Sequence, residues 1–173
     1  METRACGGFA ETVYLSPMGM MVLVSDGEAL VGLRFDDGEA KNGETDSPDV
    51  LKAAIQWLDD YFGGGRPSLD NLGIRLDGTP FQQRVWEEIS RIPYGETASY
   101  GTIAKTVAAE MGVARMSAQA VGNAVGKNPI PVMVPCHRVV GADGSMTGYA
   151  WGIGRKRFLL DLERKHAEKF ETN

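Results

Sequence analysis

The sequence has few of the residues that build metal sites or disulfide scaffolds. Its 173 residues include two cysteines, Cys6 and Cys136, and two histidines, His137 and His166. Neither cysteine belongs to a Cys-x-x-Cys pair, so a four-ligand zinc site is hard to assemble from this set. We therefore expect no metal and no cofactor. A disulfide between the two cysteines is possible in principle, but a reducing cytosol disfavours it.

Long apolar runs are also missing. No stretch approaches the roughly 20 apolar residues that a membrane-spanning helix needs. The N-terminal sequence METRACGGFAET has no basic start followed by an apolar core, as a signal peptide would have. Hydrophobic residues make up 43% of the chain and charged residues 24%, which is typical of a globular protein. We expect a cytoplasmic protein with no membrane partner.

The chain as a whole lacks an excess of positive charge, because its formal net charge is −5. The charges are unevenly distributed, however. Residues 1–75 carry 6 Lys/Arg and 13 Asp/Glu, residues 76–173 carry 12 and 10, and residues 100–160 carry 7 and 2. The basic C-terminal part could meet a polyanion while the acidic part faces away. Charge alone favours an ordinary solvated surface.

Hydrophobic patterning predicts an N-terminal α/β domain over residues 1–76. Short apolar runs separated by turn signals in 11–35 indicate an antiparallel meander. Apolar residues recur at helical spacing in 48–62, and three consecutive glycines then end the helix. We expect a polar loop over 36–48 and a short strand over 74–76. The predicted inward face of the helix consists of Val50, Leu51, Ala54, Ile55, Leu58 and Phe62.

Residues 77–173 predict a helical C-terminal domain, which makes the fold class α+β. Thr79, Ser99 and Ser117 are the expected N-caps of three helices. Two short helices followed by an extended segment over 129–141 suggest a winged helix-turn-helix-like arrangement. The helix over 118–126 is made of small residues, so it could approach a DNA groove closely or pack tightly in a core. The expected helices span 80–91, 100–109, 118–126 and 153–168.

The tetrapeptide Pro135-Cys136-His137-Arg138 is the most distinctive chemical feature of the chain. A buried cysteine is usually a small hydrophobic residue. Here, however, two cationic residues follow it directly, and cations near a thiol favour the reactive thiolate.

Adjacent side chains in an extended segment point to opposite sides, so Cys136 and His137 are not expected to touch. A bridging water is the simplest route by which the imidazole accepts the thiol proton. Glu163 on the last helix is a plausible acid to orient the histidine. The competing interpretation is a cysteine hydrolase, which would need a direct Cys–His pair.

The segment PIPVMVPCHRVVGADGSMTGYAWG, preceded by AVGNAVGKN, resembles the signature of the O6-alkylguanine-DNA alkyltransferases, also called methylated-DNA–protein-cysteine methyltransferases. The resemblance is strong over residues 80–165 and weaker over 11–75. It implies repair of O6-alkylguanine, and of O4-alkylthymine as a further substrate, by irreversible transfer of the alkyl group to Cys136. Each molecule would act once, after flipping the damaged nucleotide out of the duplex.

The resemblance also implies roles for individual residues. His137 would take the thiol proton through water while Glu163 holds the imidazole. Tyr100 would donate to the flipped base, and Asn128 would tie the recognition helix to the active-site segment. Taken singly, Glu163, Tyr100 and Asn128 fit a surface acid, a core tyrosine and an ordinary helix cap better than these roles; together with the Pro-Cys-His-Arg segment, the roles are favoured. The implied pocket consists of Val139, Tyr149, Ala150 and Trp151, and the implied DNA contacts are Ala118, Gln119, Ala120, Gly122 and Arg115.

Two positions depart from the family pattern. Trp151 stands where several members have glycine, which should disfavour bulky adducts such as benzyl. Gln119 stands where many have an arginine that enters the duplex, so we expect weaker non-specific DNA binding. The expected partner is double-stranded alkylated DNA bound by a monomer through its minor groove. A non-catalytic sensor of alkylguanine is the alternative from another class, but known sensors of this kind lack the acceptor cysteine.

Overall fold

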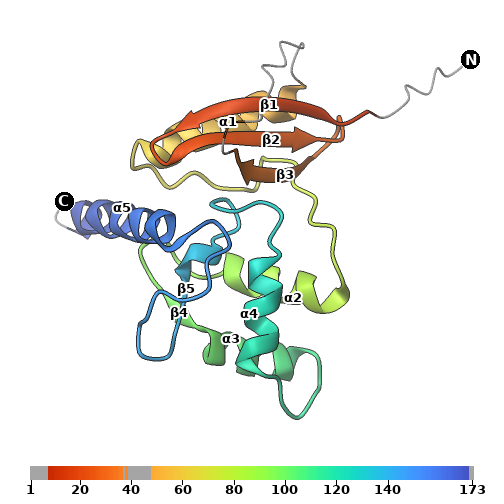
Figure 1. Ribbon diagram of the computed structural model, residues 1–173, viewed down its shortest axis with the longest axis vertical. Helices are drawn as coiled ribbons and strands as arrows, with labels where there is room; N and C mark the ends of the chain where they lie inside the picture. Colours follow the sequence, from red (N-terminus) through yellow and green to blue (C-terminus); the bar gives the residue numbers. More distant parts are fainter. Residues whose placement is uncertain (1–7, 37, 39–47, 172–173) are drawn as a thin grey trace, which may run out of the picture. The chain divides into compact units, whose positions relative to one another are not determined.

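The chain divides into two compact units, Met1–Leu76 and Asp77–Asn173. The computed structural model describes residues 8–36, 38 and 48–171 (Figure 1). Cys6 and most of the loop predicted at 36–48 lie outside the described residues.

The first unit is a three-stranded antiparallel sheet with one helix, α1, packed against it (Figure 1). The strand order is β1-β2-β3, as a meander requires, and the core of the sheet lies in the central strand at Met21, Val22 and Leu23. The predicted meander is therefore confirmed. The bounds are β1 (Ala10–Ser16), β2 (Gly19–Ser25), β3 (Leu30–Phe35) and α1 (Asp49–Phe62).

The buried face of α1 differs from the predicted one. Leu51, Ala54 and Leu58 are buried as expected, but Trp57 and Tyr61 are buried as well. These two rings stack with their centroids 5.3 Å apart, which gives the helix a large aromatic contact. Val50, Ile55 and Phe62 are only partly buried, because the packed face follows the row through residues 51, 54, 58 and 61.

The glycines that follow α1 end it as predicted. The amide of Gly63 still donates to Asp59 O at 2.9 Å, whereas Gly64 has a φ of 92°, a conformation that favours glycine. The prediction of a strand over 74–76 was wrong, because only Ile74 pairs with another strand. Ile74 forms an isolated parallel bridge with Leu30, because Gly73 O accepts from Leu30 N and Arg75 N donates to Leu30 O.

The second unit is helical, and its capped helix starts agree with the sequence. Thr79 accepts from Gln82 N at 3.2 Å, and Gln82 Oε1 accepts from Thr79 N at 2.9 Å, which is a complete capping box. Ser99 and Ser117 cap the next two helices through their hydroxyl oxygens. The helices are α2 (Pro80–Ser90), α3 (Tyr100–Glu110), α4 (Ala118–Gly126) and α5 (Ile153–Glu171).

Helices α2, α3 and α4 pack pairwise, and the buried indole of Trp86 donates to Ala124 O at 2.9 Å. A two-residue parallel ladder joins β4 (Ala98–Ser99) to β5 (Val139–Val140), which places the segment after Cys136 beside the start of α3. The predicted α+β class, with an antiparallel N-terminal unit and a helical C-terminal one, is confirmed. The winged helix-turn-helix detail stays a prediction.

Candidate active site

The backbone at Cys136 forms a tight turn, so the prediction of an extended segment was wrong at this point. Residues Cys136–Arg138 form a single 3-10 turn, η1, in which Arg138 N donates to Pro135 O at 3.0 Å. Proline at position 135 fits the residue before such a turn because it needs no amide donor. With about three residues per turn, the side chains of Cys136, His137 and Arg138 leave in three directions. The divergence of Cys136 and His137 therefore has a different geometric cause from the one predicted.

The turn before Cys136 is held by Asn128, which is 6% exposed. Its Nδ2 donates to Val134 O at 2.7 Å, and its Oδ1 accepts from Ile130 N at 3.0 Å. Between them lies Val132 with a φ of 75°, a costly conformation for a β-branched residue. Such strain persists only where surrounding contacts over-determine it. Asn128, which directly follows the last turn of α4, thus fixes the backbone that carries the thiol.

Glu163 and His137 form a fully buried pair. His137 Nε2 lies 2.7 Å from Glu163 Oε1, and both side chains are 0% exposed. A backbone amide on another segment supports the same carboxylate, because Gly95 N donates to Glu163 Oε2 at 3.0 Å. Since Nε2 is engaged by Glu163, Nδ1 is the ring nitrogen that can accept a proton.

The Arg138 side chain binds the Glu163 carboxylate. Its Nε donates to Glu163 Oε2 and its NH2 to Glu163 Oε1, each at 2.9 Å, while NH1 donates to Ile92 O at 2.7 Å. The guanidinium also lies 5.6 Å from the ring centroid of Tyr94. A bidentate guanidinium–carboxylate pair of this kind is a strong, directional contact. Arg138 therefore secures Glu163, and the prediction that its charge acts on the thiol was wrong.

The charge states follow from these neighbours. Burial raises the pKa of Glu163, but hydrogen bonds and charges from His137 and Arg138 outweigh it and hold that pKa well below its usual range. Burial lowers the pKa of His137 below 6.5, although Glu163 partly opposes the shift. A neutral imidazole oriented by an ionised carboxylate is the form that can accept a proton.

The cation that acts on the thiol is Lys156, on the first turns of α5. Burial raises the pKa of the Cys136 thiol above 9.0, and the Asn128 amide, the Lys156 ammonium and the Tyr149 hydroxyl each lower it in part. The Tyr149 hydroxyl lies near the sulfur without a hydrogen bond of standard geometry. The thiol is thus protonated at rest and needs a base to become nucleophilic.

Tyr100 opens α3 and lies along the side of α4. Its hydroxyl donates to Thr147 O at 2.9 Å, and its ring would be 3.7 Å from a Cβ at Gly122. Burial and the neighbouring Cys136 raise the pKa of Tyr100. Gly148 has a φ of 74°, and a Cβ there would come within 3.2 Å of the Tyr100 hydroxyl. A glycine at 148 thus lets the loop run close to this tyrosine.

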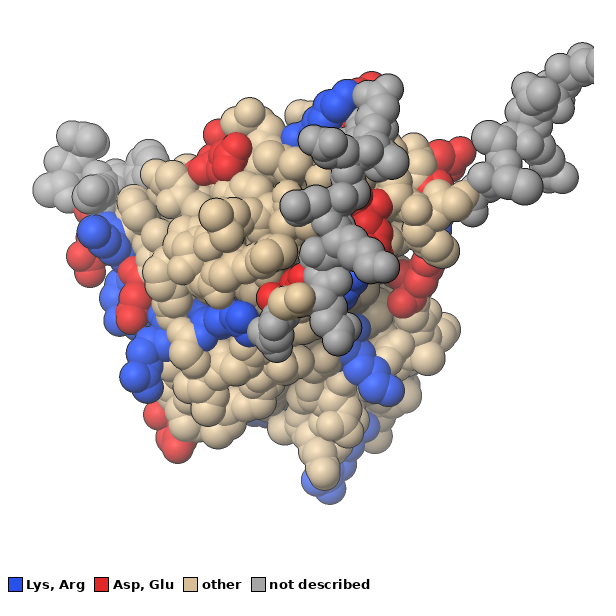
Figure 2. Space-filling model, turned by 45° about the horizontal axis from the view of Figure 1, so that its top comes forward, with Lys and Arg blue, Asp and Glu red and all other residues tan. Residues whose placement is uncertain are grey.

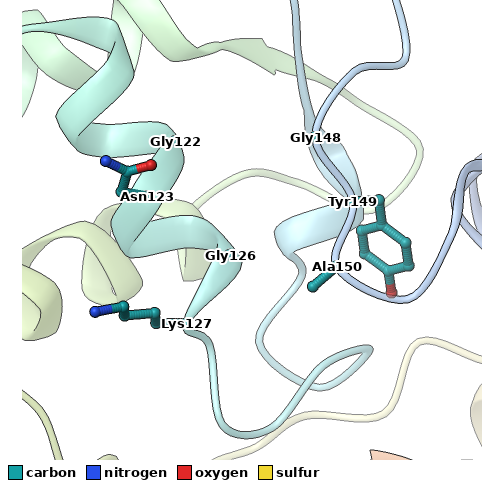
Figure 3. Close-up of a pocket in the computed structure, with 7 residues that line it drawn as sticks. All are labelled: Gly122, Asn123, Gly126, Lys127, Gly148, Tyr149 and Ala150. Atoms are coloured by element: carbon teal, nitrogen blue, oxygen red, sulfur yellow. The ribbon is translucent and has the colours of Figure 1, made fainter.

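A pocket of about 590 Å³ lies between α4 and the pocket loop, residues 147–150 (Figure 3). The two glycines on the helix side, Gly122 and Gly126, keep that wall open, and Ala150 points toward α4 from the loop. Tyr149 belongs to the pocket lining, its ring lies on the side of the loop away from α4 in Figure 3, and its hydroxyl acts on the 5% exposed Cys136 thiol. The pocket lining is Gly122, Asn123, Gly126, Lys127, Gly148, Tyr149 and Ala150.

Two of the expected pocket residues, Val139 and Trp151, do not belong to this lining. Val139 is fully buried in β5, directly after the Cys136 turn. Trp151 is half-buried next to Ala150, and its carbonyl accepts from Arg155 NH1 at 3.2 Å.

The expected DNA-contacting residues are accessible. Ala118 and Gln119 are exposed on the first turn of α4, Ala120 and Gly122 are partly exposed, and Arg115 is exposed in the turn before the helix. On the face drawn in Figure 2, Lys and Arg side chains form separate groups and no continuous basic stripe. Within the described part of the chain, no helix combines the length and apolarity needed to cross a bilayer.

Sequence reasoning missed Lys156, which stands in the basic triplet Arg155-Lys156-Arg157 and looks like a solvated surface residue. A signal was present in the helical spacing. Lys156, Leu159, Leu160 and Glu163 follow an i, i+3, i+4, i+7 pattern, and all four are buried. The same period that buries Glu163 therefore buries Lys156.

A buried cysteine, a neutral histidine held by an ionised glutamate, and a pocket beside a helix of small residues define a protein built for thiol-based nucleophilic chemistry. Comparison with known proteins agrees with this class. Residues 10–76 match the family described as "6-O-methylguanine DNA methyltransferase, ribonuclease-like domain", and residues 80–165 match "6-O-methylguanine DNA methyltransferase, DNA binding domain".

Individual relatives cover most of the chain. The methylated-DNA–protein-cysteine methyltransferase of Mycolicibacterium paratuberculosis is 44% identical over 155 residues, which are 88% of this chain and 90% of that protein. Its namesake from Mycobacterium bovis is 45% identical with the same coverage. The crystal structure of Mycobacterium tuberculosis OGT in complex with DNA matches with a TM-score of 0.77 at 43% identity, over 90% of this chain and 93% of that one. This chain belongs to the 6-O-methylguanine DNA methyltransferase family.

Proposed function

We propose that this protein repairs O6-alkylguanine in DNA by transferring the alkyl group irreversibly to its own Cys136. The observation that carries the proposal is the combination of a buried thiol, the His137–Glu163 pair and an adjoining pocket bounded by α4. The relatives named above support the same reaction, since their names describe transfer of a methyl group from DNA to a protein cysteine.

The proposed transfer needs only the protein, water and the alkylated base. His137 Nδ1 takes the thiol proton through a water molecule, while Glu163 keeps Nε2 in place. The thiolate then attacks the alkyl carbon in line, forming a C–S bond as the C–O6 bond breaks. The electron pair leaves with guanine, which must gain a proton or hydrogen bond. Because the thioether product is stable, each protein molecule reacts once.

Tyr100 is the proposed donor to the leaving base, supported by its position between α4 and the pocket loop. Its hydroxyl donates a hydrogen bond to Thr147 O in this structure. To donate to a base, Tyr100 must first break that bond. We propose that a protein monomer binds duplex DNA through the minor groove with α4 and flips the damaged nucleotide toward the pocket. Flipping costs a few kcal/mol, and least for a weakened alkylated pair. O4-alkylthymine would be a second substrate.

A label-transfer experiment tests the proposal. A duplex carrying one O6-methylguanine with a tritiated methyl group is incubated with excess wild-type protein, Cys136→Ser or Cys6→Ser. The wild-type protein and the Cys6→Ser control should retain one label per lesion, and Cys136→Ser should retain none. Tight binding of the duplex by the wild-type protein without label transfer would overturn the proposal in favour of a sensor. In a second incubation with the duplex in excess, demethylation of more lesions than there are protein molecules would favour a hydrolase.

A further inference from the structure

Lys156 carries a fully buried amine in the middle of the proposed site. Its side chain is 0% exposed, and burying an ammonium is costly unless its donors are satisfied. Nζ donates to Val139 O at 2.5 Å and to Thr147 O at 3.2 Å. It also lies 5.8 Å from the ring centroid of Tyr100, within range of a cation–π contact. These neighbours belong to three segments that surround the site: β5, the pocket loop and α3.

The carbonyl of Thr147 has two donors, Tyr100 Oη and Lys156 Nζ. If Tyr100 turns its hydroxyl toward a flipped base, Thr147 loses one of them. The bond from Lys156 remains, so the backbone next to Gly148 and Tyr149 keeps an anchor during the exchange. Lys156 thus makes the movement of Tyr100 compatible with a fixed pocket loop.

The ammonium also acts on the thiol electrostatically. Cys136 is faced by Tyr100 from α3, Tyr149 from the pocket loop and Lys156 from α5, with Asn128 as a polar neighbour and His137 beside it on its own turn. Lys156 is the cationic member of this group, because Arg138 is engaged by Glu163. Its charge therefore favours the thiolate over the thiol.

We propose that Lys156 is a positioning residue for the transfer, because its ammonium fixes two backbone segments of the site and brings a positive charge toward the Cys136 sulfur. This rests on the proposed function for its biological meaning. The electrostatic part can be measured without DNA, so the two proposals can fail separately.

The test measures alkylation of Cys136 by iodoacetamide as a function of pH, followed by peptide mass analysis that separates Cys136 from Cys6. The reagent probes thiolate directly, since sulfur displaces iodide without a damaged base. Lys156→Gln should move the pH midpoint upward by about one unit, which lowers the rate near neutral pH about tenfold. Lys156→Arg should retain most of the wild-type profile. Lys165→Gln, which removes an exposed lysine from the same helix, should leave it unchanged.

An unchanged midpoint in a folded Lys156→Gln protein would overturn the proposal. Should that variant not fold, the wild-type protein provides the same information. With lysine labelled at the ε-carbon, the Lys156 signal is titrated by NMR before and after Cys136 is capped with iodoacetamide. Coupling predicts that capping lowers the titration midpoint of Lys156, because the thiolate is gone. Identical curves would contradict the proposal whatever the result with methylated DNA.

Discussion

In the first unit, charged side chains with defined partners lie at the surface, as in the Arg34–Glu11 ion pair with side chains 46% and 52% exposed. Its buried polar residues, within the described ranges, are two serines at strand ends. The second unit buries an amide, an imidazole, an ammonium and a carboxylate, at Asn128, His137, Lys156 and Glu163. Burying polar groups is unfavourable unless they are paired, so a sheet and helix can be stabilised without them. Because these four buried polar residues lie around Cys136, we infer that they are kept for its reaction and not for stability.

The sharpest way to test this contrast is to remove the carboxylate that organises the buried network. Glu163→Gln should destabilise the protein by about 3–5 kcal/mol, because the Arg138 cation, whose side chain is only 11% exposed, is left without its anion. Transfer by the remaining folded protein should slow by about 10²–10⁴-fold, since the histidine base loses its orienting partner. Urea unfolding and single-turnover methyl transfer measure the two effects.

The matched control lies on the same helix. Asp161→Asn removes an exposed carboxylate 3.4 Å from Arg164, and such surface pairs contribute only about 0–1 kcal/mol. Equal losses in the two variants would show that burial of Glu163 confers no special role.

The next largest effect is a dependence of stability on pH that arises from His137 in the second unit. The pKa of His137 lies below 6.5 in the folded protein, so the unfolded chain binds a proton there first as pH falls. Stability should therefore decrease with falling pH from about 6.5, by at most ~1.4 kcal/mol per pH unit for this residue. Because burial lowers the pKa of His137, transfer by protein that remains folded should decline at a lower pH than the one at which free histidine titrates.

Thermal melting and single-turnover rates from pH 5 to 8, with His166→Gln as the comparison, separate these effects. A transfer rate that halves at the pH where free histidine titrates would be inconsistent with a buried neutral base.

The smallest expected effects come from replacing a glycine in each of two helices, Gly122 in α4 and Gly101 in α3. Gly122→Ala should raise stability by roughly 0.5–1 kcal/mol, because alanine is the better helix former and its Cβ meets the Tyr100 ring at an ordinary 3.7 Å. It should nevertheless slow transfer, since the methyl group narrows the pocket wall. Gly101→Ala in α3, which does not line that pocket, should give similar stabilisation with unchanged transfer. If Gly122→Ala transfers at the wild-type rate, α4 does not need an open surface there.

Much of the architecture could be read from local sequence. Thr79, Ser99 and Ser117 cap helices where their side chains predicted, and the meander followed from alternation and turn residues. These features depend on neighbours within a few positions. The 3-10 turn at Cys136 could not be predicted in this way, because it depends on Asn128 closing the strained backbone at Val132.

The site shows the same division between local and tertiary information. The likeness of the Pro-Cys-His-Arg segment to a known family pointed to Cys136, His137 and Glu163, and the structure brings the last two within 2.7 Å. The partners of Arg138 and Lys156 depend on how α5 lies against the η1 turn. A basic side chain next to a cysteine in sequence is therefore a poor guide to which cation faces the sulfur in space.

Tandem mass spectrometry of the wild-type protein, after incubation with an excess of O6-methylguanine duplex, shows whether Cys136 accepts the alkyl group once and keeps it. We expect a single added methyl group, located on the Cys136 sulfur, and one restored guanine per protein molecule. A methyl group on any other residue, or more guanine restored than protein present, would contradict it.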